Sequence, residues 1–421
     1  MSIAFPQFQY RFMAAMGHVI FPANFHPVGT QVAAREMVQR VRPAAAAAPE
    51  PGAGGRWLVV GGSGGFGSAA RAVLGARRGA HTLNLSYDAA PNLDSKNKVR
   101  QVGSPGFHRS LALEQELRAQ GLVARSVLGD AFDPQVREAV VREIHEHFDG
   151  AIDGIVWALA APRALDPRTG KPVQSALRPL GSPVTLQTFS GRDARTGEPP
   201  RVVELTVEPG TPEQAVGTTY VMGGGIVDRW ISTLLAADVL APGFTLLTIS
   251  YRGNPLNEGL YRKGLIGLAK ADLEYTTRAL HEVLAARVGG RACAVEGPAV
   301  VTEASGGIPG VPFYLAHVMD VMGEAFEDPA DSMRRMFDAH VGEAGPTLDD
   351  EGLLRMDDRE LTEEVQAEMR ARYEAATPGE PFPEPLYDAF MRAYAQTRGF
   401  DVSGVDYEAE FDPAEVCAPG E

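Results

Sequence analysis

The sequence has few cysteines and no long apolar run. Cys293 and Cys417 are its only cysteines among 421 residues, and no pair has the spacing of a metal site. This excludes a disulfide framework and a zinc centre, and it fits a reducing cytosol. No stretch reaches the roughly 18 apolar residues of a membrane span, and the N-terminus lacks a basic region followed by an apolar run. We therefore expect a cytoplasmic protein with no membrane span and no metal.

Positive charge is also scarce. Lysine and arginine total 39 against 54 aspartate and glutamate residues, so the net charge is -15. An acidic chain is unsuited to nucleic acid, and we expect no nucleic-acid partner. Anionic cofactors stay possible, because one helix N-terminus with a local cation can hold a phosphate.

Between residues 55 and 310 the sequence alternates short apolar runs with segments of helical periodicity. The runs "RWLVV", "AHTLNLSYD", "VARSVLGD", "DGIVWALA", "FTLLTIS" and "CAVEGPAVV" are bounded by glycine or polar residues, as buried strands are. A long helix is expected from about Gly264 to Val288, and another begins at Pro134 behind the N-cap Asp133. This order predicts an α/β fold with a doubly wound parallel sheet of the Rossmann type, enlarged from a short-chain reductase.

Three segments interrupt or flank this pattern. Residues 1–54 form an N-terminal segment that ends in the Pro/Ala/Gly linker "PAAAAAPEPGAGG". Residues 162–220 predict β-hairpins inserted into a loop of the Rossmann domain, which spans 55–310. Residues 311–421 are acidic and helical, with no further strand expected, and predict a substrate lid packed on the same core.

A glycine-rich stretch follows the first buried strand. Gly61, Gly65 and Gly67 let backbone amides approach a pyrophosphate and let the next helix pack tightly on its strand. Asp88 ends the second strand about 20 residues later, where a ribose-binding acid belongs. An ordinary glycine turn and an ordinary strand-end aspartate are the alternatives. A carboxylate would repel a 2′-phosphate, so NADH is favoured over NADPH. Three basic residues that weaken this preference follow: Lys96, Lys98 and Arg100.

Tyr261 and Lys270 lie nine positions apart in "YRKGLIGLAK". On one regular helix that separation, about 900° of rotation, would put them on opposite faces. They can act together only if Tyr261 precedes the helix, which the breaker-rich "NPLNEGLYRKG" permits. The phenol would then act as a general acid, with the ammonium lowering its pKa and holding the cofactor ribose. A buried tyrosine and a solvated lysine are the alternative.

These segments resemble the trans-2-enoyl-CoA and enoyl-acyl-carrier-protein reductases of the FabV type. "YRKGLIGLAKADLE" is similar to the family's active-site segment of tyrosine, eight residues and lysine. Further similar segments include "FHPVG", "VVGGSGGFG", "GDAF", "SYRG", "VVTEAS" and "RMDDREL" across nearly the whole chain. The resemblance implies NADH-dependent reduction of the C2=C3 bond of an acyl thioester, carried by CoA or acyl-carrier protein. It also implies a single-chain monomer with an extended lid.

The resemblance assigns roles to individual residues. It implies that Tyr261 donates a proton and stabilises an enolate, that Lys270 binds the cofactor, and that Tyr251 contacts the substrate. The implied cofactor-binding residues are Gly61, Ser63, Gly65, Phe66, Gly67, Tyr87, Asp88, Asp130, Ala131, Leu159, Ala160, Lys270, Thr302, Ala304 and Ser305.

The chain departs from the family's pattern around the expected acyl pocket. Arg252 replaces an isoleucine beside Tyr251, Glu258 stands near a position usually held by a Trp-Pro pair, and Glu303 replaces a glutamine. Arg252 and Glu258 are therefore candidate substrate-binding residues together with Tyr251, and we expect a polar or charged acyl group. Alternatively, these side chains point to solvent.

Other functions remain to be separated by experiment. The Tyr/Lys pair could serve an NAD(P)H-dependent carbonyl or alcohol oxidoreductase of a secondary-metabolite pathway, and the chain could bind NADH without turnover. A metal at His145 and His147 is disfavoured because helix neighbours two apart diverge by about 200°.

Overall fold

The structure is a computed structural model that describes residues 2–14, 18–44, 48–192, 197–342 and 345–418. The remaining residues of the expected N-terminal segment, linker, insertion and lid lie outside this range: 1, 15–17, 45–47, 193–196, 343–344 and 419–421. The division expected at residues 54 and 310 stays a prediction.

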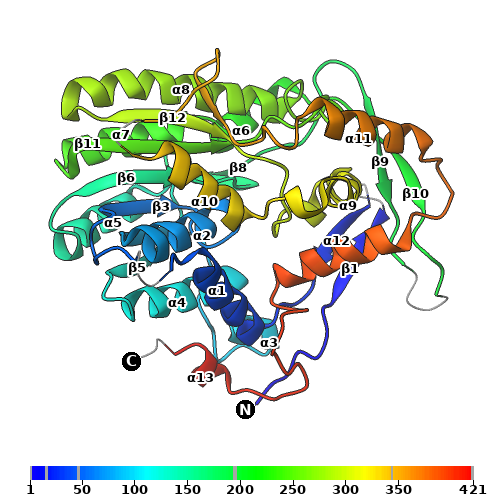
Figure 1. Cartoon of the computed structure of the whole chain (residues 1–421), viewed down its shortest axis with the longest axis horizontal. Helices are drawn as coiled ribbons and strands as arrows, with labels where there is room; N and C mark the ends of the chain where they lie inside the picture. The colour runs from blue at the N-terminus through cyan, green and yellow to red at the C-terminus, as the bar shows by residue number, and fades with distance from the viewer. Residues whose placement is uncertain (1, 15–17, 45–47, 193–196, 343–344, 419–421) are drawn as a thin grey trace.

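A seven-stranded sheet forms the centre of the molecule, and each of its neighbouring strand pairs is parallel (Figure 1). The strand order is β13-β12-β11-β6-β3-β4-β5, which changes direction beside β3 as in a doubly wound fold. The predicted fold class is confirmed. The strands are β3 (Arg56–Val60), β4 (His81–Ser86), β5 (Ala124–Leu128), β6 (Ile152–Trp157), β11 (Leu240–Ser250), β12 (Arg291–Glu296) and β13 (Leu353–Arg355).

The inner strands of the sheet bury both of their faces. Successive side chains of a strand point to opposite sides, so Trp57 and Val59 enter one apolar core while Leu58 and Val60 enter the other. This explains why the strands read as continuous apolar runs. The first core is covered by α1 (Pro27–Val41), α2 (Gly65–Ala72) with its π-helical continuation η3 (Val73–Arg77), α4 (Pro105–Arg118) and α10 (Pro329–His340). The second is covered by α5 (Pro134–His147), α6 (Pro212–Met222), α7 (Gly225–Ala236) and α8 (Leu265–Val288).

The helix signals in the sequence act as expected. Asp133 accepts a hydrogen bond from the Gln135 amide at the start of α5. Gly264 precedes the first residue of α8, and Gly289 ends that helix in the left-handed conformation, with φ of 63°. The predicted limits of α8 are confirmed.

The C-terminal helices pack beside the sheet around an aromatic core that they share with two hairpins (Figure 1). Phe189 from β9 contacts Phe382, Tyr387 and Phe390 of the C-terminal region. The elements are α9 (Val311–Met322), α11 (Glu363–Ala375), α12 (Glu384–Gln396), β1 (Tyr10–Met13), β2 (Val19–Pro22), β9 (Val184–Phe189) and β10 (Val202–Val207). Short elements complete the chain: α3 (Lys98–Gln101), β7 (Arg163–Asp166), β8 (Lys171–Gln174), η4 (Ser305–Gly307), η5 (Gly323–Ala325) and α13 (Pro413–Val416).

Two details of the predicted organisation are wrong. The expectation of no strand after residue 310 fails, because β13 pairs with β12 at the edge of the sheet. The expected insertion at 162–220 does contain the hairpins β7–β8 and β9–β10, but its last part is helix α6, which begins with a capping box between Thr211 and Gln214.

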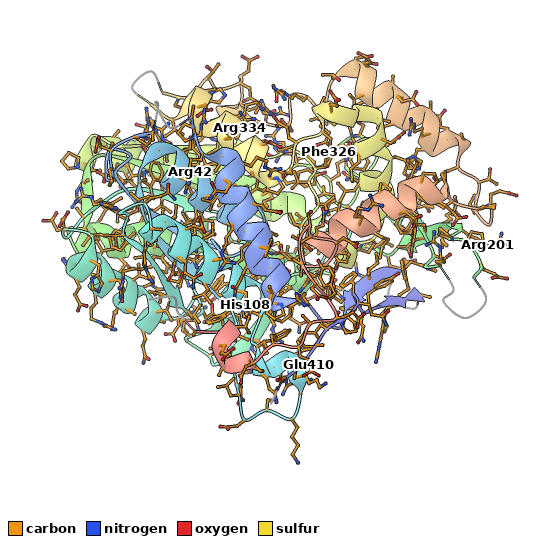
Figure 2. The ribbon with its side chains drawn as sticks, turned by 60° about the horizontal axis from the view of Figure 1, so that its bottom comes forward. Arg42, His108, Arg201, Phe326, Arg334 and Glu410 are labelled. Atoms are coloured by element: carbon orange, nitrogen blue, oxygen red, sulfur yellow. The ribbon has the colours of Figure 1, made fainter. Side chains whose placement is uncertain are left out.

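Helix α1 connects distant parts of the chain. The Gln31 side-chain amide lies 3.0 Å from Nδ1 of the buried His108 on α4 and donates to the Val416 carbonyl at 2.8 Å. His108 lies beneath α1 in Figure 2. The N-terminal residue Ile3 pairs with Phe411 through an isolated bridge. The two ends of the chain are therefore held against the same part of the Rossmann layer.

Among the described residues, no helix combines the length and the apolarity that a membrane span needs.

Trp230 of α7 lies fully inside the second core, and its indole N–H donates to the Ala131 carbonyl at 2.9 Å. Its ring packs edge-on against Trp157 of β6, with the centroids 6.2 Å apart.

We expect Trp230→Phe to lower the free energy of unfolding by about 1–3 kcal/mol, because it leaves a small void and leaves the Ala131 carbonyl with only the long hydrogen bond from Arg137 at 3.5 Å. Urea unfolding measures this change. Val216→Ala on α6, at a side chain that is 72% exposed, is the control and should shift stability by less than about 0.5 kcal/mol. Equal stability of Trp230→Phe and the parent would contradict the argument.

Candidate active site

The glycine turn between β3 and α2 brings backbone atoms into direct contact. A Cβ atom at Gly67 would lie 2.1 Å from the Gly61 carbonyl oxygen, and one at Gly61, where φ is +83°, would lie 2.9 Å from the Ala158 carbonyl. Both positions therefore require glycine. The amides of Gly64, Gly65 and Phe66 have no hydrogen-bond acceptor among the described residues. They form a polar cradle at the N-terminus of α2 that suits an anion.

Asp88 lies two residues beyond β4. Its Oδ1 accepts a hydrogen bond from the Ser104 hydroxyl at 2.9 Å, while Oδ2 is buried and has no partner among the described residues. A ribose hydroxyl would satisfy that oxygen. Tyr87, expected beside it, is 78% exposed.

The other predicted cofactor residues follow the ends of neighbouring strands. Asp130 and Ala131 follow β5, and Leu159 and Ala160 follow β6. The carboxyl ends of parallel strands share one edge of the sheet, where ligands of such folds bind. In the segment after β12, Thr302 packs against the glycine turn, 3.3 Å from the Cβ position of Gly65. Ser305 is buried and Ala304 is exposed in the same segment.

Tyr261 lies in a series of turns before α8, so the condition that the sequence set for a Tyr/Lys pair is met. The Tyr261 amide donates to the Asn257 carbonyl, and the Gly264 amide donates to the Tyr261 carbonyl. Gly253 packs against the Tyr261 side chain with φ of +78°, a position where a Cβ would lie 2.7 Å from that of Tyr261. The main chain is thus folded tightly around the buried phenol.

The structure brings Tyr251 and Tyr261 together. Their rings meet edge to face with the centroids 4.9 Å apart. Apolar side chains of the β9–β10 hairpin and α6 pack around the pair. The cluster includes Val184, Leu186, Leu205, Val207, Met222, Leu260, Ile266 and Ile308. The two tyrosines therefore lie under this cluster of apolar side chains, which we call the apolar roof.

Lys270 is also buried, in the second turn of α8, and its Nζ donates to the Ile249 carbonyl at 3.4 Å. Burial lowers its pKa, against which the charges of Glu296 and Glu274 act. Burial raises the pKa of Tyr261 and also raises that of Tyr251 well above its usual value. The expectation that a nearby ammonium lowers the pKa of Tyr261 is thus wrong for this structure, because burial is the one cause of the shift and it raises the pKa. Both phenols stay protonated at neutral pH and are hydrogen-bond donors.

Arg252 does not face the tyrosine pair as a free cation. Its guanidinium pairs with Glu274 at 3.2 Å, with Glu296 at 3.7 Å and with Glu351 at 2.6 Å, while Arg262 pairs with Glu274 from the other side. Glu258 pairs with Lys263 at 2.5 Å on the surface. The charges that suggested a polar substrate are therefore neutralised within the protein.

Glu360 and Tyr314 lie close enough to Tyr251 to interact with it electrostatically. Neither residue was singled out from the sequence. The Tyr314 hydroxyl donates to Glu360 Oε1 at 2.6 Å, and the Ala299 amide donates to Oε2 at 2.6 Å. Burial raises the pKa of Glu360 to about 7. The charge of Glu360 contributes to the raised pKa of Tyr251. The segment "RMDDREL" contains Glu360, but its run of charged residues is typical of an exposed segment and carries no signal of burial.

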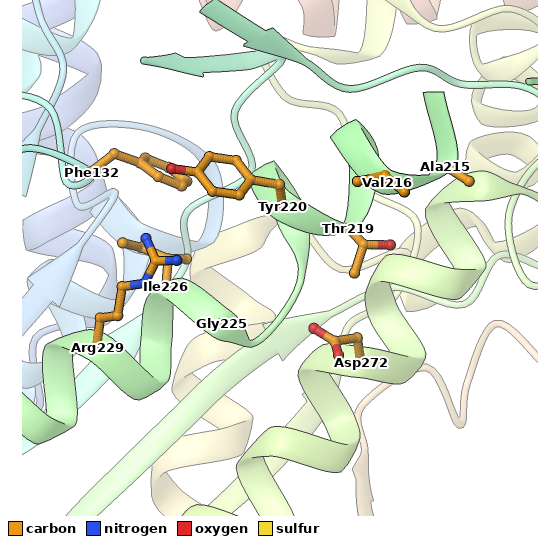
Figure 3. Close-up of a pocket in the computed structure, with 9 residues that line it drawn as sticks. All are labelled: Phe132, Ala215, Val216, Thr219, Tyr220, Gly225, Ile226, Arg229 and Asp272. Atoms are coloured by element: carbon orange, nitrogen blue, oxygen red, sulfur yellow. The ribbon is translucent and has the colours of Figure 1, made fainter. Parts of the chain in front are cut away.

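A cavity of about 460 Å³ opens between α6 and α7 (Figure 3). Phe132 and Tyr220 stack at one end, with the Arg229 guanidinium 5.7 Å from the Tyr220 ring centre. None of the predicted site residues lines it. Met222 of α6 instead packs on the apolar cluster around the tyrosine pair.

Three family models match consecutive parts of the chain. The model described as the NAD(P)H binding domain of trans-2-enoyl-CoA reductase matches residues 15–93, and the trans-2-enoyl-CoA reductase catalytic region matches 101–341. A third, described as the enoyl reductase FAD binding domain, matches 348–411. The described residues of that last segment form α11, α12 and one short edge strand, without a glycine turn that could cradle a pyrophosphate. They do not fit a flavin nucleotide, and no step is derived from one.

Full-length relatives support the same assignment. The enoyl-[acyl-carrier-protein] reductase [NADH] of Burkholderia vietnamiensis is 34% identical over 94% of this chain and 95% of its own length. The enzyme of the same name from Opitutus terrae is 34% identical over 92% and 95%. Among solved structures, trans-2-enoyl-CoA reductase from Clostridium acetobutulicum in complex with NADH superimposes with a TM-score of 0.86, at 29% identity and full coverage of both chains. The Treponema denticola enzyme in complex with NAD gives 0.84, at 31% identity and 98% coverage of both chains.

The buried carboxyl of Glu296 should make stability depend on pH. Burial and then the charge of Glu274 raise its pKa to about 8, although Arg252 opposes this. An unfolded glutamate titrates near ~4.3. Between about pH 5 and 8 the folded state therefore keeps a proton that the unfolded state has lost. Each rise of one pH unit should then lower the free energy of unfolding by up to about 1.4 kcal/mol.

We expect Glu296→Gln to remove this contribution, so its stability should fall less than that of the parent between pH 5 and 8. Urea unfolding at constant ionic strength measures both curves. Glu282→Gln, at an exposed position of α8, is the control and should give a curve parallel to that of the parent. A parallel curve for Glu296→Gln would refute the assignment of a buried proton.

Proposed function

Because this chain belongs to the trans-2-enoyl-CoA reductase family, we propose that it reduces the C2=C3 bond of a trans-2-enoyl thioester with NADH. When bound, NADH supplies a hydride from its nicotinamide ring to C3. The observation that carries the proposal is the buried contact of Tyr251 with Tyr261, beside a sheet edge that also bears the glycine turn.

Tyr261 would donate a hydrogen bond to the thioester oxygen as negative charge develops there. Its raised pKa is compatible with this role, because a buried phenol that keeps its proton remains available as a donor toward an enolate. Tyr251 would hold the thioester against Tyr261, and C2 would take up the proton that Tyr261 donates, which a proton from solvent then replaces.

Lys270 of α8 would hold the cofactor ribose, because its buried ammonium lies against the Ile249 carbonyl near the end of β11. The free Oδ2 of Asp88 would accept from the adenosine ribose, and the same carboxylate would repel a 2′-phosphate. This supports NADH as the cofactor in preference to NADPH.

The acyl group is proposed to be apolar. Aliphatic side chains surround the tyrosine pair, and Arg252 and Glu258 are engaged in ion pairs. The thioester carrier is CoA or acyl-carrier protein. We propose that the protein acts as a monomer, since the side chains packed around the tyrosine pair come from this one chain, and that it works in the cytoplasm.

Tyr261→Phe keeps the ring contact with Tyr251 and removes only the hydroxyl. We expect kcat to fall by roughly 10²–10⁴-fold, the usual contribution of a positioned acid, with the Kd for NADH unchanged within about twofold. NADH oxidation with a short trans-2-enoyl-CoA measures kcat, and nucleotide fluorescence measures Kd. Tyr275→Phe on α8, 68% exposed, is the control and should keep full activity. Full activity of Tyr261→Phe would overturn its role.

The substrate class is tested by comparing three thioesters of similar length: an unbranched trans-2-enoyl-CoA, the same acyl chain with a terminal carboxylate, and the matching β-ketoacyl-CoA. We expect kcat/KM to be highest for the first, because an apolar roof gives a buried carboxylate no partner. Faster turnover of the β-ketoacyl substrate would identify a carbonyl reductase. No turnover of any of them, with NADH still bound, would indicate a binding protein.

A further inference from the structure

A carboxylate lies against the glycine turn. The segment after β12 crosses this turn, and Glu303 projects onto Gly64, the residue that precedes α2. Its Oε2 and Oε1 lie 3.1 and 3.3 Å from the Cβ position of that glycine. The negative charge is thus held beside the unpartnered amides of the first turn of α2, where a dinucleotide pyrophosphate would bind.

Arg109 of α4 fixes this carboxylate in place. Its Nη2 pairs with Glu303 Oε1 at 2.5 Å and also donates to the Thr397 carbonyl at 2.9 Å, while Nη1 donates to the Ser63 carbonyl inside the turn. The Arg109 side chain is only 11% exposed. One cation therefore joins the turn, the segment after β12 and the end of α12.

The pair borders an open space. Gly65, Ser68, Thr302, Arg109 and Glu303 line a cavity of about 190 Å³ between α1, α2 and α10. The carboxylate is 25% exposed, so solvent and salt only partly screen it. An arriving pyrophosphate would meet a like charge whose nearest cation is already engaged.

We propose that Glu303 sets the affinity for the dinucleotide by opposing its pyrophosphate, and that Arg109 is the positioning residue that holds the carboxylate at the turn. This rests on the proposed NADH-binding function. The carboxylate makes the cofactor bind more weakly than the turn alone would permit, and it favours release of the oxidised nucleotide.

The test is the Kd of ADP-ribose and of NADH for the full chain, measured by calorimetry. Glu303→Gln keeps the shape and removes the charge, so both Kd values should fall by about tenfold, as expected for one partly screened charge a few ångströms away. The gain should shrink as salt is raised. The Kd of adenosine, which has no pyrophosphate, should not change.

Arg109→Gln should raise the Kd of ADP-ribose, because it leaves Glu303 unpaired, and Glu303→Gln in that background should reverse most of the loss. Glu368→Gln breaks an ion pair of similar type with Arg372 at 2.8 Å on α11 and should change nothing. Thermal unfolding checks that each variant is folded.

Three results would overturn the proposal: an unchanged or higher Kd in Glu303→Gln, an equal change for adenosine and ADP-ribose, or a gain that does not depend on salt. If neither the parent nor the variant binds ADP-ribose or NADH, both this inference and the proposed function are wrong. Normal NADH binding with equal Kd values overturns this inference alone.

Discussion

The contact between the backbone at Gly67 and the carbonyl of Gly61 is the constraint on which the site depends. A side chain at Gly67 would push α2 away from β3, because its Cβ would lie 2.1 Å from that carbonyl oxygen. With glycine there, the first turn of α2 stands at the sheet edge with its amides free. The segments that follow β4, β5, β6 and β12 then line the same edge, since parallel strands end together.

Burial decides the protonation of the groups around this edge. Tyr251, Tyr261, Glu296 and Glu360 all have raised pKa values, and desolvation is the largest cause in each case. The phenols are therefore donors at neutral pH. A reductase that stabilises an enolate needs such donors rather than a phenolate, so the apolar roof that excludes water also keeps the hydroxyls in their useful form.

Much of the fold could be predicted because its signals are local. The strand runs, the glycine turn and the helix that begins behind Gly264 all depend on residues close in sequence. The short strand β13 has too few residues to show a pattern. The ion-pair partners of Arg252 could not be predicted from the sequence either. Glu351 lies 99 residues away, and only the folded chain brings the two charges together. A polar acyl pocket was therefore expected where the structure has an internal ion-pair cluster.

The C-terminal helices and the glycine turn meet at the segment that follows β12. The Glu303 carbonyl accepts from the Tyr394 hydroxyl and from Arg398, both in the C-terminal region, while Arg109 reaches the Thr397 carbonyl from α4. A ligand that displaces the Glu303 carboxylate would break its pair with Arg109, which also donates to the end of α12. Since α12 shares an aromatic core with the β9–β10 hairpin that packs over the tyrosine pair, contiguous packing joins the glycine turn to the tyrosine pair.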